Sequence, residues 1–238
     1  MRPEVIDAAR YQMLRSLAGD PAFADVPATV LQTLVEQAQV SEARRGRVIY
    51  EAGETWGRLG FVVDGCIAMA AIGDDGKEHQ YELIFGGQFF GVSAIFDGGA
   101  EMARTVVVSE NLRYASIQRE HVLAAARTYG TLAIAFAVTL AHRVRRTTAL
   151  LAEQVNLTAR ERIARYLLQF AVDDEMSEAR EPLRLLTLTQ IGAAAGTVKD
   201  VASRTITALE QAGALRRERG NVRWLDASVL RRFARTER

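Results

Sequence analysis

The 238-residue chain contains little cysteine and little histidine, and this scarcity limits its chemistry. Its one cysteine, Cys66, cannot form a disulfide within the chain and cannot alone hold a four-cysteine iron–sulfur cluster. The three histidines, His79, His121 and His142, show no paired spacing, whereas a metal enzyme of the cupin type needs clustered His and Glu ligands. We therefore expect no metal site, no iron–sulfur cluster and no haem, a small buried Cys66, and histidines that are exposed or hydrogen-bonded.

Long apolar runs are also missing. No stretch of about 18 uncharged apolar residues occurs, and the first residues, MRPEVIDAARYQ, carry acids where a signal peptide carries a basic region. We therefore expect no membrane partner and a cytoplasmic location. No nucleophile, base and orienting group stand at a characteristic spacing, so we expect no enzymatic activity. The 49% hydrophobic content and the length indicate two modest domains with buried cores.

The formal net charge of +1 conceals an asymmetry along the chain. Residues 1–157 carry 15 Lys and Arg against 18 Asp and Glu, whereas residues 158–238 carry 15 against 11. From Thr187 onward the balance is 10 against 5. A basic surplus at the C-terminal end is typical of a surface that faces a polyanion.

Between Arg47 and Ile117 the sequence consists mainly of short β-rich runs separated by glycines. The runs are RVIYEAG, RLGFVVDG, CIAMAAIG, EHQYELIF, RTVVV and LRYASI. Short strands at this spacing predict an antiparallel sandwich or small barrel. In the intervening DDGKE, the pair Asp75–Gly76 predicts a hairpin turn, because type I′ turns need the positive φ that glycine adopts freely.

Residues 131–156 contain no glycine or proline and predict one long helix. Apolar or small residues recur along it four and three apart, which is the spacing of a seam between two paired helices. The seam residues are Leu140, Val144, Thr147 and Leu151. A second stripe with Phe136 and Leu150 points elsewhere, so the helix is expected to pack on its own β domain while the seam meets a second copy. An ordinary core helix is the alternative interpretation.

The last third of the chain shows two helix starts with the same pattern. Thr158 with Glu161, and Thr187 with Gln190, have the spacing of a capping box, in which each side chain satisfies a free backbone amide. A hairpin, ALRRERGNVRWL, follows the helices, and we expect its turn near Gly220–Asn221. Three helices followed by a hairpin predict a winged helix-turn-helix.

The segment GTVKDVASRTITALEQAGAL is the predicted second helix of that motif. The small residues Gly192–Ala195 before it allow two helices to approach closely, and Gly196 permits the tight turn between them. Helical spacing predicts which side of the helix is buried. The residues expected there are Val201 or Ala202, Ile206 and Leu209.

Four polar residues occupy the other face of this helix, in its first turns. They are Lys199, Asp200, Ser203 and Arg204. The first turns of such a helix enter the major groove of DNA, where arginine can bind guanine O6 and N7, aspartate can accept from cytosine N4, and Lys or Ser can reach a base edge or a phosphate. A surface ion pair between Asp200 and Arg204 is the alternative interpretation, and the two roles are compatible.

Further DNA contacts are expected outside this helix. Thr187 and the arginines of the predicted wing, Arg216, Arg217 and Arg219, are candidates for binding the phosphate backbone without sequence preference. A solvated run of charges is the alternative interpretation of the wing arginines.

After about residue 27 the chain resembles the bacterial transcription factors of the cyclic-AMP receptor protein and fumarate–nitrate regulator family, the Crp/Fnr family. The segments that carry the resemblance are IYEAGETWGRLGFVVDGCIAM, DDGKEHQYELIFGGQFFG, TARERIARYLL and LTQIGAAAGTVKDVASRTITALEQAGAL. The resemblance implies an α+β fold with an N-terminal antiparallel β-roll of the jelly-roll-like, cyclic-nucleotide-binding type, a long dimerisation helix and a C-terminal winged helix-turn-helix. It also implies a homodimer that binds a two-fold symmetric site on double-stranded DNA and contacts RNA polymerase.

The recognition helix of the family contains a Glu, Ser and Arg that read the bases. The matching positions here are Asp200, Ser203 and Arg204, with Lys199 where some members have Arg. Aspartate shortens the acidic side chain by one methylene. Val198 and Val201 stand where Ser or Thr is common, so the resemblance implies that hydroxyl contacts to phosphate are lost there. We expect Thr197 to cap the helix, with Asp200 as its third residue.

The nucleotide site of the family is only partly retained. The positions that match it are Gly91, Val92, Arg104, Thr105, Thr147 and Thr148. Val92 replaces the glutamate that holds the ribose, whereas Arg104 retains the phosphate contact. A buried Arg104 needs an acidic ligand or an internal carboxylate such as Glu101, and pairing within the protein or exposure is the alternative. The expected effector is a nucleotide other than cyclic AMP, another anion, or none.

Together these observations predict a homodimeric, sequence-specific transcription regulator that is controlled by a signal sensed in the β-roll. We expect an N-terminal extension over residues 1–26, with a short helix or arm, the β-roll over 27–122, the dimerisation helix over 123–157 and the winged helix-turn-helix over 158–238. The alternative function is a cyclic-nucleotide-binding module that acts through protein partners rather than DNA. Its discriminating feature is the helix that starts at Lys199.

Overall fold

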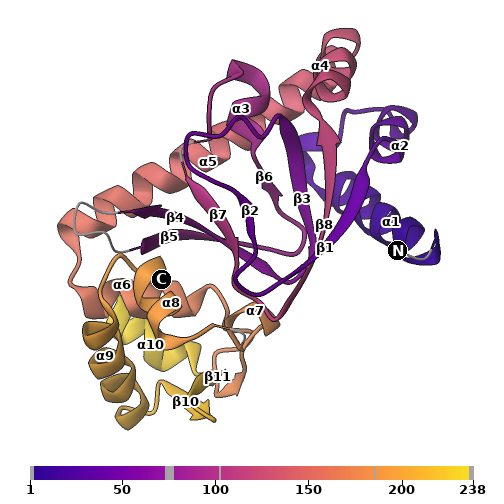
Figure 1. Ribbon diagram of the computed structural model, residues 1–238. Coiled ribbons are helices and arrows are strands. Elements are labelled where there is room, and N and C mark those ends of the chain that lie inside the picture. The colour runs from indigo at the N-terminus through magenta and orange to yellow at the C-terminus, as the bar shows by residue number, and fades with distance from the viewer. Residues whose placement is uncertain (1–2, 73–77, 102, 185, 236–238) are drawn as a thin grey trace. The chain divides into compact units, whose positions relative to one another are not determined.

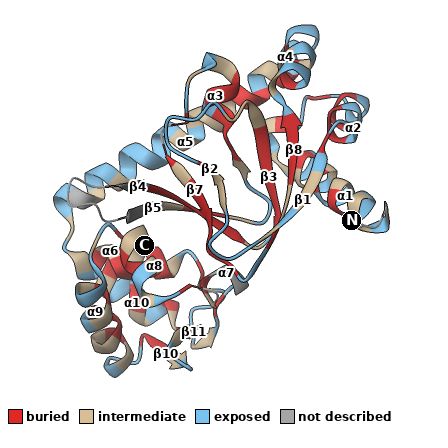
Figure 2. Ribbon diagram, viewed as in Figure 1, coloured by how far each residue is buried: buried red, intermediate tan, exposed pale blue. Residues whose placement is uncertain are grey.

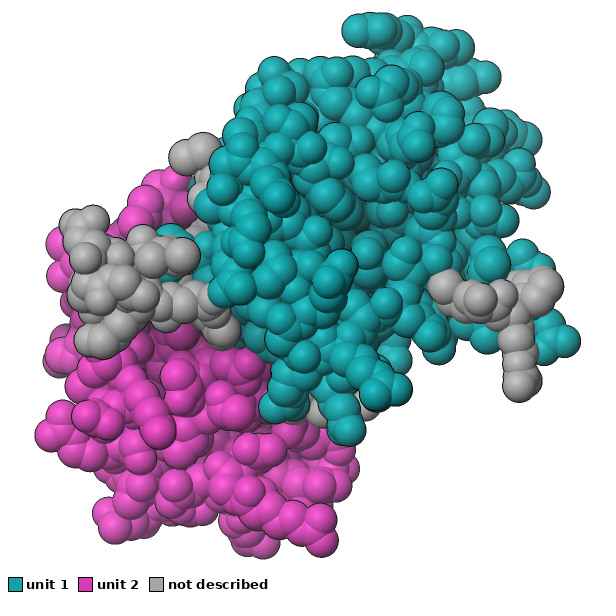
Figure 3. Space-filling model, in the orientation of Figure 1, with its two compact units in different colours: residues 1–71, 83–146 teal, residues 72–82, 147–238 magenta. Residues whose placement is uncertain are grey.

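The computed structural model describes residues 3–72, 78–101, 103–184 and 186–235, and Figure 1 shows its helices and strands. They form two compact units, one of residues 1–71 with 83–146 and the other of residues 72–82 with 147–238 (Figure 3). The hairpin turn expected at Asp75–Gly76 lies outside the described residues. The predicted α+β class is confirmed.

The strands between residues 39 and 118 form two antiparallel sheets, with strand orders β1-β8-β3-β6 and β2-β7-β4-β5 (Figure 1). The strands are β1 (Gln39–Arg44), β2 (Val48–Tyr50), β3 (Arg58–Asp64), β4 (Cys66–Ile72), β5 (Glu78–Phe85), β6 (Phe89–Phe90), β7 (Arg104–Val107) and β8 (Asn111–Gln118). Every β-rich run of the sequence corresponds to one of these strands, and β8 extends one residue beyond its run at each end. Strands β1 and β6 were not predicted from the sequence, because β1 is mostly polar and partly exposed and β6 has only two residues.

Strand β3 shows why these residues make a two-sheet core. Leu59, Phe61 and Val63 are buried in one hydrophobic cluster, together with helices, whereas Val62 is buried in a second cluster with residues of the other sheet. Because successive side chains of a strand point to opposite faces, β3 is covered on both sides. A run of apolar residues without polar alternation is the expected sequence for such a strand.

Helices surround this β-roll. They are α1 (Pro3–Gly19), the short 3₁₀ helix η1 (Pro21–Phe23), α2 (Ala28–Glu36), α3 (Val92–Asp97), α4 (Arg119–Thr128) and α5 (Gly130–Asn156). Within the described ranges no single helix is long and apolar enough to cross a membrane, and only α4 and α5 together, bent by 118°, reach the length and composition of a span.

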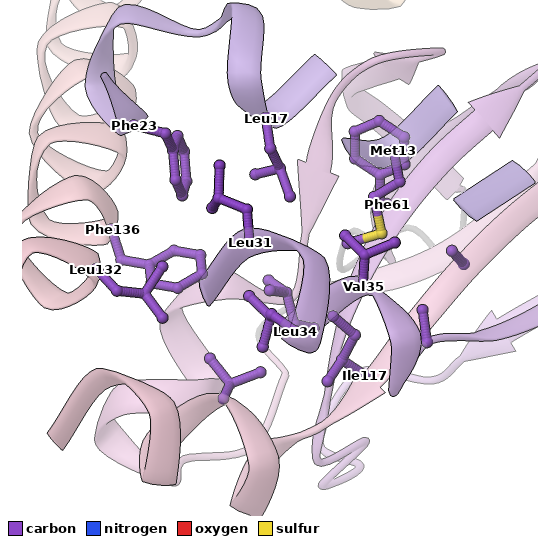
Figure 4. Close-up of a cluster of buried hydrophobic side chains, with 14 of the residues drawn as sticks. Met13, Leu17, Phe23, Leu31, Leu34, Val35, Phe61, Ile117, Leu132 and Phe136 are labelled. Atoms are coloured by element: carbon purple, nitrogen blue, oxygen red, sulfur yellow. The ribbon is translucent and has the colours of Figure 1, made fainter. Parts of the chain in front are cut away.

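The N-terminal residues form part of the core. Met13 and Leu17 of α1 are fully buried beside Leu31 of α2 and Phe61 of β3 in the cluster shown in Figure 4. Phe23 meets Phe136 of α5 edge to face, with ring centroids 5.5 Å apart. The expectation of a helix in this region is therefore confirmed, but α1 is 17 residues long rather than short, and it packs into the β-roll and is not a free arm.

A second cluster lies between the sheets and is rich in aromatic rings. The Trp56 ring stacks on Phe90 with a centroid distance of 5.0 Å, and Tyr50 lies 5.1 Å from Trp56. Gly60 is required beside them, because a Cβ at this position would lie 2.2 Å from the Phe90 ring. Offset ring pairs of this kind stabilise a core beyond the area that they bury.

Helix α5 has two different halves. Leu132 and Phe136 are buried in the core of the β-roll, whereas Val144, Leu151 and Val155 are 65%, 59% and 85% exposed. Figure 2 shows this change from buried to exposed colours along the helix. The interpretation as an ordinary core helix therefore fits only the first half.

The second unit contains the remaining elements. They are α6 (Ala159–Leu168), β9 (Ser177–Glu178), α7 (Glu181–Arg184), α8 (Leu188–Ala194), α9 (Lys199–Gln211), β10 (Leu215–Glu218), β11 (Asn221–Leu225) and α10 (Ala227–Ala234). Both capping boxes are present, at Thr158 with Glu161 and at Thr187 with Gln190. The wing turn lies one residue earlier than expected, at Arg219–Gly220, where both residues have the positive φ of a type I′ turn.

Candidate nucleic-acid interface and effector site

Helices α8 and α9 approach each other closely, as the small residues between 192 and 195 predict. A Cβ at Gly192 would lie 2.8 Å from the Cβ of Ala202, which is closer than carbon atoms pack. Gly196 has φ +65°, and the amide of Thr197 donates to the Gly192 carbonyl at 2.8 Å. These contacts close the turn of a helix-turn-helix.

The two faces of α9 differ in burial. Ala202, Ile206 and Leu209 are fully buried, and Val201 is half-buried, so Ala202 is the residue of the predicted pair that enters the core. Of the four candidate base-reading residues, Lys199, Asp200 and Arg204 are exposed, and Ser203 is half-buried. The structure therefore brings all four together on the exposed side of the first turns of α9.

The surface ion pair between Asp200 and Arg204, which was the alternative interpretation, is not formed. The Arg204 guanidinium donates to the backbone carbonyl of Asp200, with a distance of 3.4 Å, and among the described residues no ion pair joins the two side chains. The Asp200 carboxylate and most of the Arg204 guanidinium are therefore available to another molecule.

The expected cap at Thr197 is wrong. The N-cap residue of α9 is Val198, which makes no side-chain hydrogen bond to the helix, and Asp200 is the second helical residue rather than the third. The physical reason is that the backbone of Thr197 belongs to the turn that closes on Gly192.

Thr187 holds the start of α8. Its hydroxyl donates to Oε1 of Gln190 at 3.0 Å and accepts from the Gln190 amide at 3.3 Å. A phosphate needs a hydrogen-bond donor, so Thr187 would have to give up its bond to Gln190 to contact DNA through this hydroxyl.

The wing arginines are not equivalent. Arg216 and Arg219 are exposed and have no ion-pair partner among the residues that the structure describes. The guanidinium of Arg217 is instead held by Glu210 of α9, with Nε–Oε2 2.8 Å and Nη2–Oε2 2.5 Å. Two of the three arginines therefore have guanidinium groups that are free to meet phosphates.

In the β-roll, Gly91 and Val92 lie at the start of α3, at the positions that the family resemblance assigns to the ribose contact. Gly91 has φ +72°, and a Cβ there would lie 2.8 Å from the carbonyl oxygen of Arg58, so only glycine fits. Val92 is buried in the hydrophobic cluster with Ile95 and Phe136. A side chain in that position offers a ribose hydroxyl no hydrogen bond.

Arg104 and Thr105 lie on β7. The Arg104 side chain is partly exposed and forms an ion pair with Glu51, with Nε–Oε2 3.1 Å, so the internal carboxylate beside it is Glu51 and not the expected Glu101. Thr105 is fully buried, and its hydroxyl has no hydrogen-bond partner in the described part of the chain. Thr147 and Thr148 are exposed on α5, in the second unit.

Glu101 is itself unusual, because it is buried and its Oε1 has no partner among the described residues. Burial raises the pKa of this carboxyl above its ordinary value, and the nearby charge of Arg143 opposes part of the rise. Glu101 therefore favours the protonated form more than an exposed glutamate does.

Sequence models of two known protein families match successive parts of the chain, the first in the β-roll and the second in the region of the helix-turn-helix. A model of the cyclic nucleotide-binding domain matches residues 40–129, and a model of the Crp-like helix-turn-helix domain matches residues 161–233. The chain belongs to the Crp/Fnr family. It is a Crp-like transcription regulator with a helix-turn-helix DNA-binding domain.

Among its relatives, the chain is 25% identical over 221 residues to the CRP-like cAMP-activated global transcriptional regulator of Mycobacterium tuberculosis, which covers 92% of this chain and 98% of the relative. It is 26% identical over 218 residues to the cyclic AMP receptor protein of Thermus thermophilus, with the same coverage. The solved catabolite activator protein of Thermus thermophilus is 25% identical, with a TM-score of 0.51 over 90% of this chain and 98% of that chain. FixK2 from Bradyrhizobium japonicum shares the fold, with a TM-score of 0.74 at 18% identity over 84% of this chain and 99% of that chain.

One residue that supports the helix-turn-helix of this Crp/Fnr protein was not predicted from the sequence. Arg162 of α6 donates to the carbonyls of Ala195 at 2.8 Å and Gly196 at 3.0 Å, and to Leu157 at 2.7 Å. It therefore holds the C-terminal end of α8 and the turn to α9. No local signal identifies this role, because 33 residues separate Arg162 from Ala195.

The cysteine and two of the three histidines are among the side chains that the structure describes, whereas the side chain of His79 is not. Cys66 is buried on β4, and burial raises the pKa of its thiol, so it stays protonated. His121 and His142 are exposed. Within the described residues no group of three or more His, Cys, Asp or Glu side chains is arranged to hold a metal ion.

Proposed function

We propose that the protein is a homodimer that binds a two-fold symmetric site on double-stranded DNA, and that a signal at the β-roll changes this affinity. The observation that carries the proposal is the exposed polar face of α9, where no ion pair joins the acidic and basic side chains to other described residues. Helix α9 is the second helix of a closely packed pair, and in a helix-turn-helix the second helix enters the major groove of DNA. The cellular setting that fits this function is the cytoplasm.

The proposed base contacts are the four residues in the first turns of α9. Arg204 would bind guanine O6 and N7 with two parallel bonds, Asp200 would accept from cytosine N4, and Lys199 and Ser203 would reach a base edge or a phosphate. The absence of a side-chain ion pair between Asp200 and Arg204 supports this role, because neither group has to be released before it binds a base.

The proposed phosphate contacts are Arg216 and Arg219 of the wing, whose guanidinium groups are free. Thr187 and Arg217 would have to give up hydrogen bonds within the protein to make such contacts. Phosphate contacts set the position of the protein on the duplex but carry little sequence information.

The exposed apolar residues in the second half of α5 support the dimer. Val144 and Leu151 belong to the predicted seam with Leu140 and Thr147, and Val155 continues it by four residues. Leaving such a stripe in water is unfavourable by about 1.5–3 kcal/mol for each large side chain that a partner helix could bury. We propose that two copies pair along this seam. In this dimer the β-roll over residues 27–122, with α1 packed into its core, is the sensor, residues 123–157 contain the dimerisation helix, and residues 158–238 bind DNA.

The proposed effector is a nucleotide or another anion that binds at Arg104 and Thr105. The hydroxyl of Thr105 supports this site, because it is buried without a partner among the described residues and would gain a hydrogen bond from a ligand oxygen. To bind the ligand, Arg104 would have to leave its ion pair with Glu51, so the free energy of ligand binding must exceed the free energy lost when this pair breaks. The cAMP-activated relatives suggest a cyclic nucleotide, but buried Val92 gives a ribose no acceptor.

The test begins with the purified protein. Denaturation followed by mass spectrometry identifies any bound small molecule, and selection from random duplex DNA with and without it identifies the site. On that site Arg204→Ala is expected to cost about 1–3 kcal/mol and to relax selectivity, whereas Arg216→Ala is expected to weaken all sequences alike and to lower the salt dependence.

Equal losses on specific and random DNA for Arg204→Ala would contradict the assignment of the base contacts. Failure of the protein to select any duplex would favour the alternative function, a regulatory module that acts on protein partners. RNA polymerase is proposed as a further partner, and the exposed acidic residues of the 172–182 segment are the surface to test against it.

A further inference from the structure

The wing is attached to α9 through one carboxylate. Both oxygens of Glu210, near the C-terminal end of α9, accept hydrogen bonds from Arg217 of β10. Oε2 accepts from the guanidinium at 2.8 Å and 2.5 Å, and Oε1 accepts from the Arg217 backbone amide at 2.9 Å. The guanidinium also lies 3.5 Å from the hydroxyl of Thr207, one helical turn earlier. Both the main chain and the side chain of β10 are therefore bound to α9.

This contact has the features of a strong ion pair. The two side chains are 30% and 26% exposed, the bonds are charge-assisted, and the hydrogen bonds from Arg217 hold the pKa of Glu210 below its ordinary value. A carboxylate near a surface that binds phosphates opposes binding by its charge. The position of Glu210 on α9 is therefore explained better by its hydrogen bonds to Arg217 than by contact with DNA.

The other edge of the wing is held in a similar way. Glu178 of β9 accepts from Arg223 of β11 at 3.2 Å and pairs with Arg184 of α7, and Glu218 of β10 pairs with Arg223 at 3.3 Å. After these pairs are counted, Arg216 and Arg219 are the wing arginines left without a partner in the described part of the chain.

We infer that Glu210 and Arg217 are positioning residues, which set the wing at a fixed angle to α9 so that Arg216 and Arg219 reach phosphates while the polar face of α9 meets the bases. The inference rests on the proposed function. It differs from the simplest expectation for Arg217, which is that it binds a phosphate itself.

The first test uses Glu210→Gln, because the two roles predict opposite signs. If only charge mattered, removal of a negative charge would free Arg217 for phosphate and tighten DNA binding. If the ion pair positions the wing, the variant binds the selected duplex about three- to tenfold more weakly. The plot of the logarithm of the binding constant against the logarithm of salt concentration becomes less steep by about 1–2, because the phosphate contacts of Arg216 and Arg219 are lost. Glu4→Gln on α1, an exposed site, is the control for net charge.

The second test uses Arg217→Lys, which keeps the charge. Lysine binds a phosphate as a point charge but cannot make the paired bonds that arginine makes to a carboxylate. Positioning predicts a loss similar to that of Glu210→Gln, whereas phosphate binding by residue 217 predicts nearly wild-type affinity. Arg15→Lys on α1, at an exposed arginine outside the residues proposed to contact DNA, is the control for this change of side chain and is expected to change little.

Thermal unfolding of each variant accompanies the binding measurements, so that loss of fold is distinguished from loss of wing position. Wild-type affinity and salt slope in both Glu210→Gln and Arg217→Lys would overturn the inference and leave the proposed function intact. Absence of duplex binding by the wild-type protein itself would overturn both. A loss of affinity without a change of slope would show that Arg216 and Arg219 still reach the phosphates, which also contradicts the inference.

Discussion

The close contact between α8 and α9 yields a quantitative prediction. Gly192 and Ala202 face each other where the two helices of the helix-turn-helix are packed, and a methyl group on Gly192 would lie 2.8 Å from the methyl of Ala202. Neither carbon can rotate away, because each Cβ is fixed by its own backbone. Gly192→Ala therefore forces the two helices apart.

Two opposing terms set the size of the effect. An alanine in a helix is favoured over glycine by up to about 1 kcal/mol, whereas overpacking in a tight core costs about 1–3 kcal/mol. We expect a net loss of about 1 kcal/mol in the free energy of unfolding, which lowers the melting temperature of a domain of 60–100 residues by about 4–8 °C. At Gly130, where an added Cβ has nothing within 4 Å, alanine is expected to cause no loss.

Urea unfolding of a double-mutant cycle separates these terms. Ala202→Gly removes the methyl group that Gly192→Ala would meet, so the two changes together are expected to recover about 1–3 kcal/mol relative to the sum of the single changes. The affinities of these variants for the selected duplex should rank in the same order as their stabilities, because the angle between α8 and α9 sets how α9 enters the major groove. Additive losses in the cycle would refute the steric reasoning.

Three further predictions test other parts of the molecule. Leu151→Glu on the exposed stripe of α5 is expected to convert dimers into single chains in sedimentation experiments, because an unpaired carboxylate is costly in an apolar seam, and an unchanged dimer would exclude this seam. Met13→Ala is expected to cost about 2–5 kcal/mol of unfolding free energy, whereas Tyr11→Ala at a site 66% exposed should cost little, and equal effects would contradict the core role of α1. Because the pKa of Glu101 is raised in the folded state, its contribution to stability is complete below its unfolded pKa and is lost as pH rises through its folded pKa. The unfolding free energy of Glu101→Gln relative to the wild type should therefore increase as pH rises above the ordinary pKa of glutamate, about 4.3, and a constant difference would contradict this.

Much of the fold could be predicted from short stretches of sequence. The β-rich runs mark their strands, the Thr158–Glu161 pair marks the start of α6, and the glycine-free segment 131–156 matches α5 to within one residue. The helix-turn-helix was found in the same way, from small residues and helical spacing. Each of these signals depends on residues within a few positions of one another, where backbone geometry limits the choices.

The roles of several charged residues could not be predicted in that way. Arg104 could be matched to a phosphate contact, but its pairing with Glu51 joins β7 to the residue that follows β2, far away in the sequence. Arg217 could be placed in the wing, but its attachment to Glu210 appears only when β10 folds back on α9. Residues 1–26 had no motif to match, and yet Met13 and Phe23 are core residues of the β-roll.

The sequence by itself determined the order of the elements, the two capping boxes and the polar face of α9, because these follow from the periodicity of local backbone structure. The tertiary structure decided which arginines are free and which are bound, where α1 packs, and which residue precedes α9. The physical reason is that an ion pair or a buried side chain depends on which groups the folded chain brings within a few ångströms, and partners such as Arg162 and Ala195, 33 residues apart, share no local pattern.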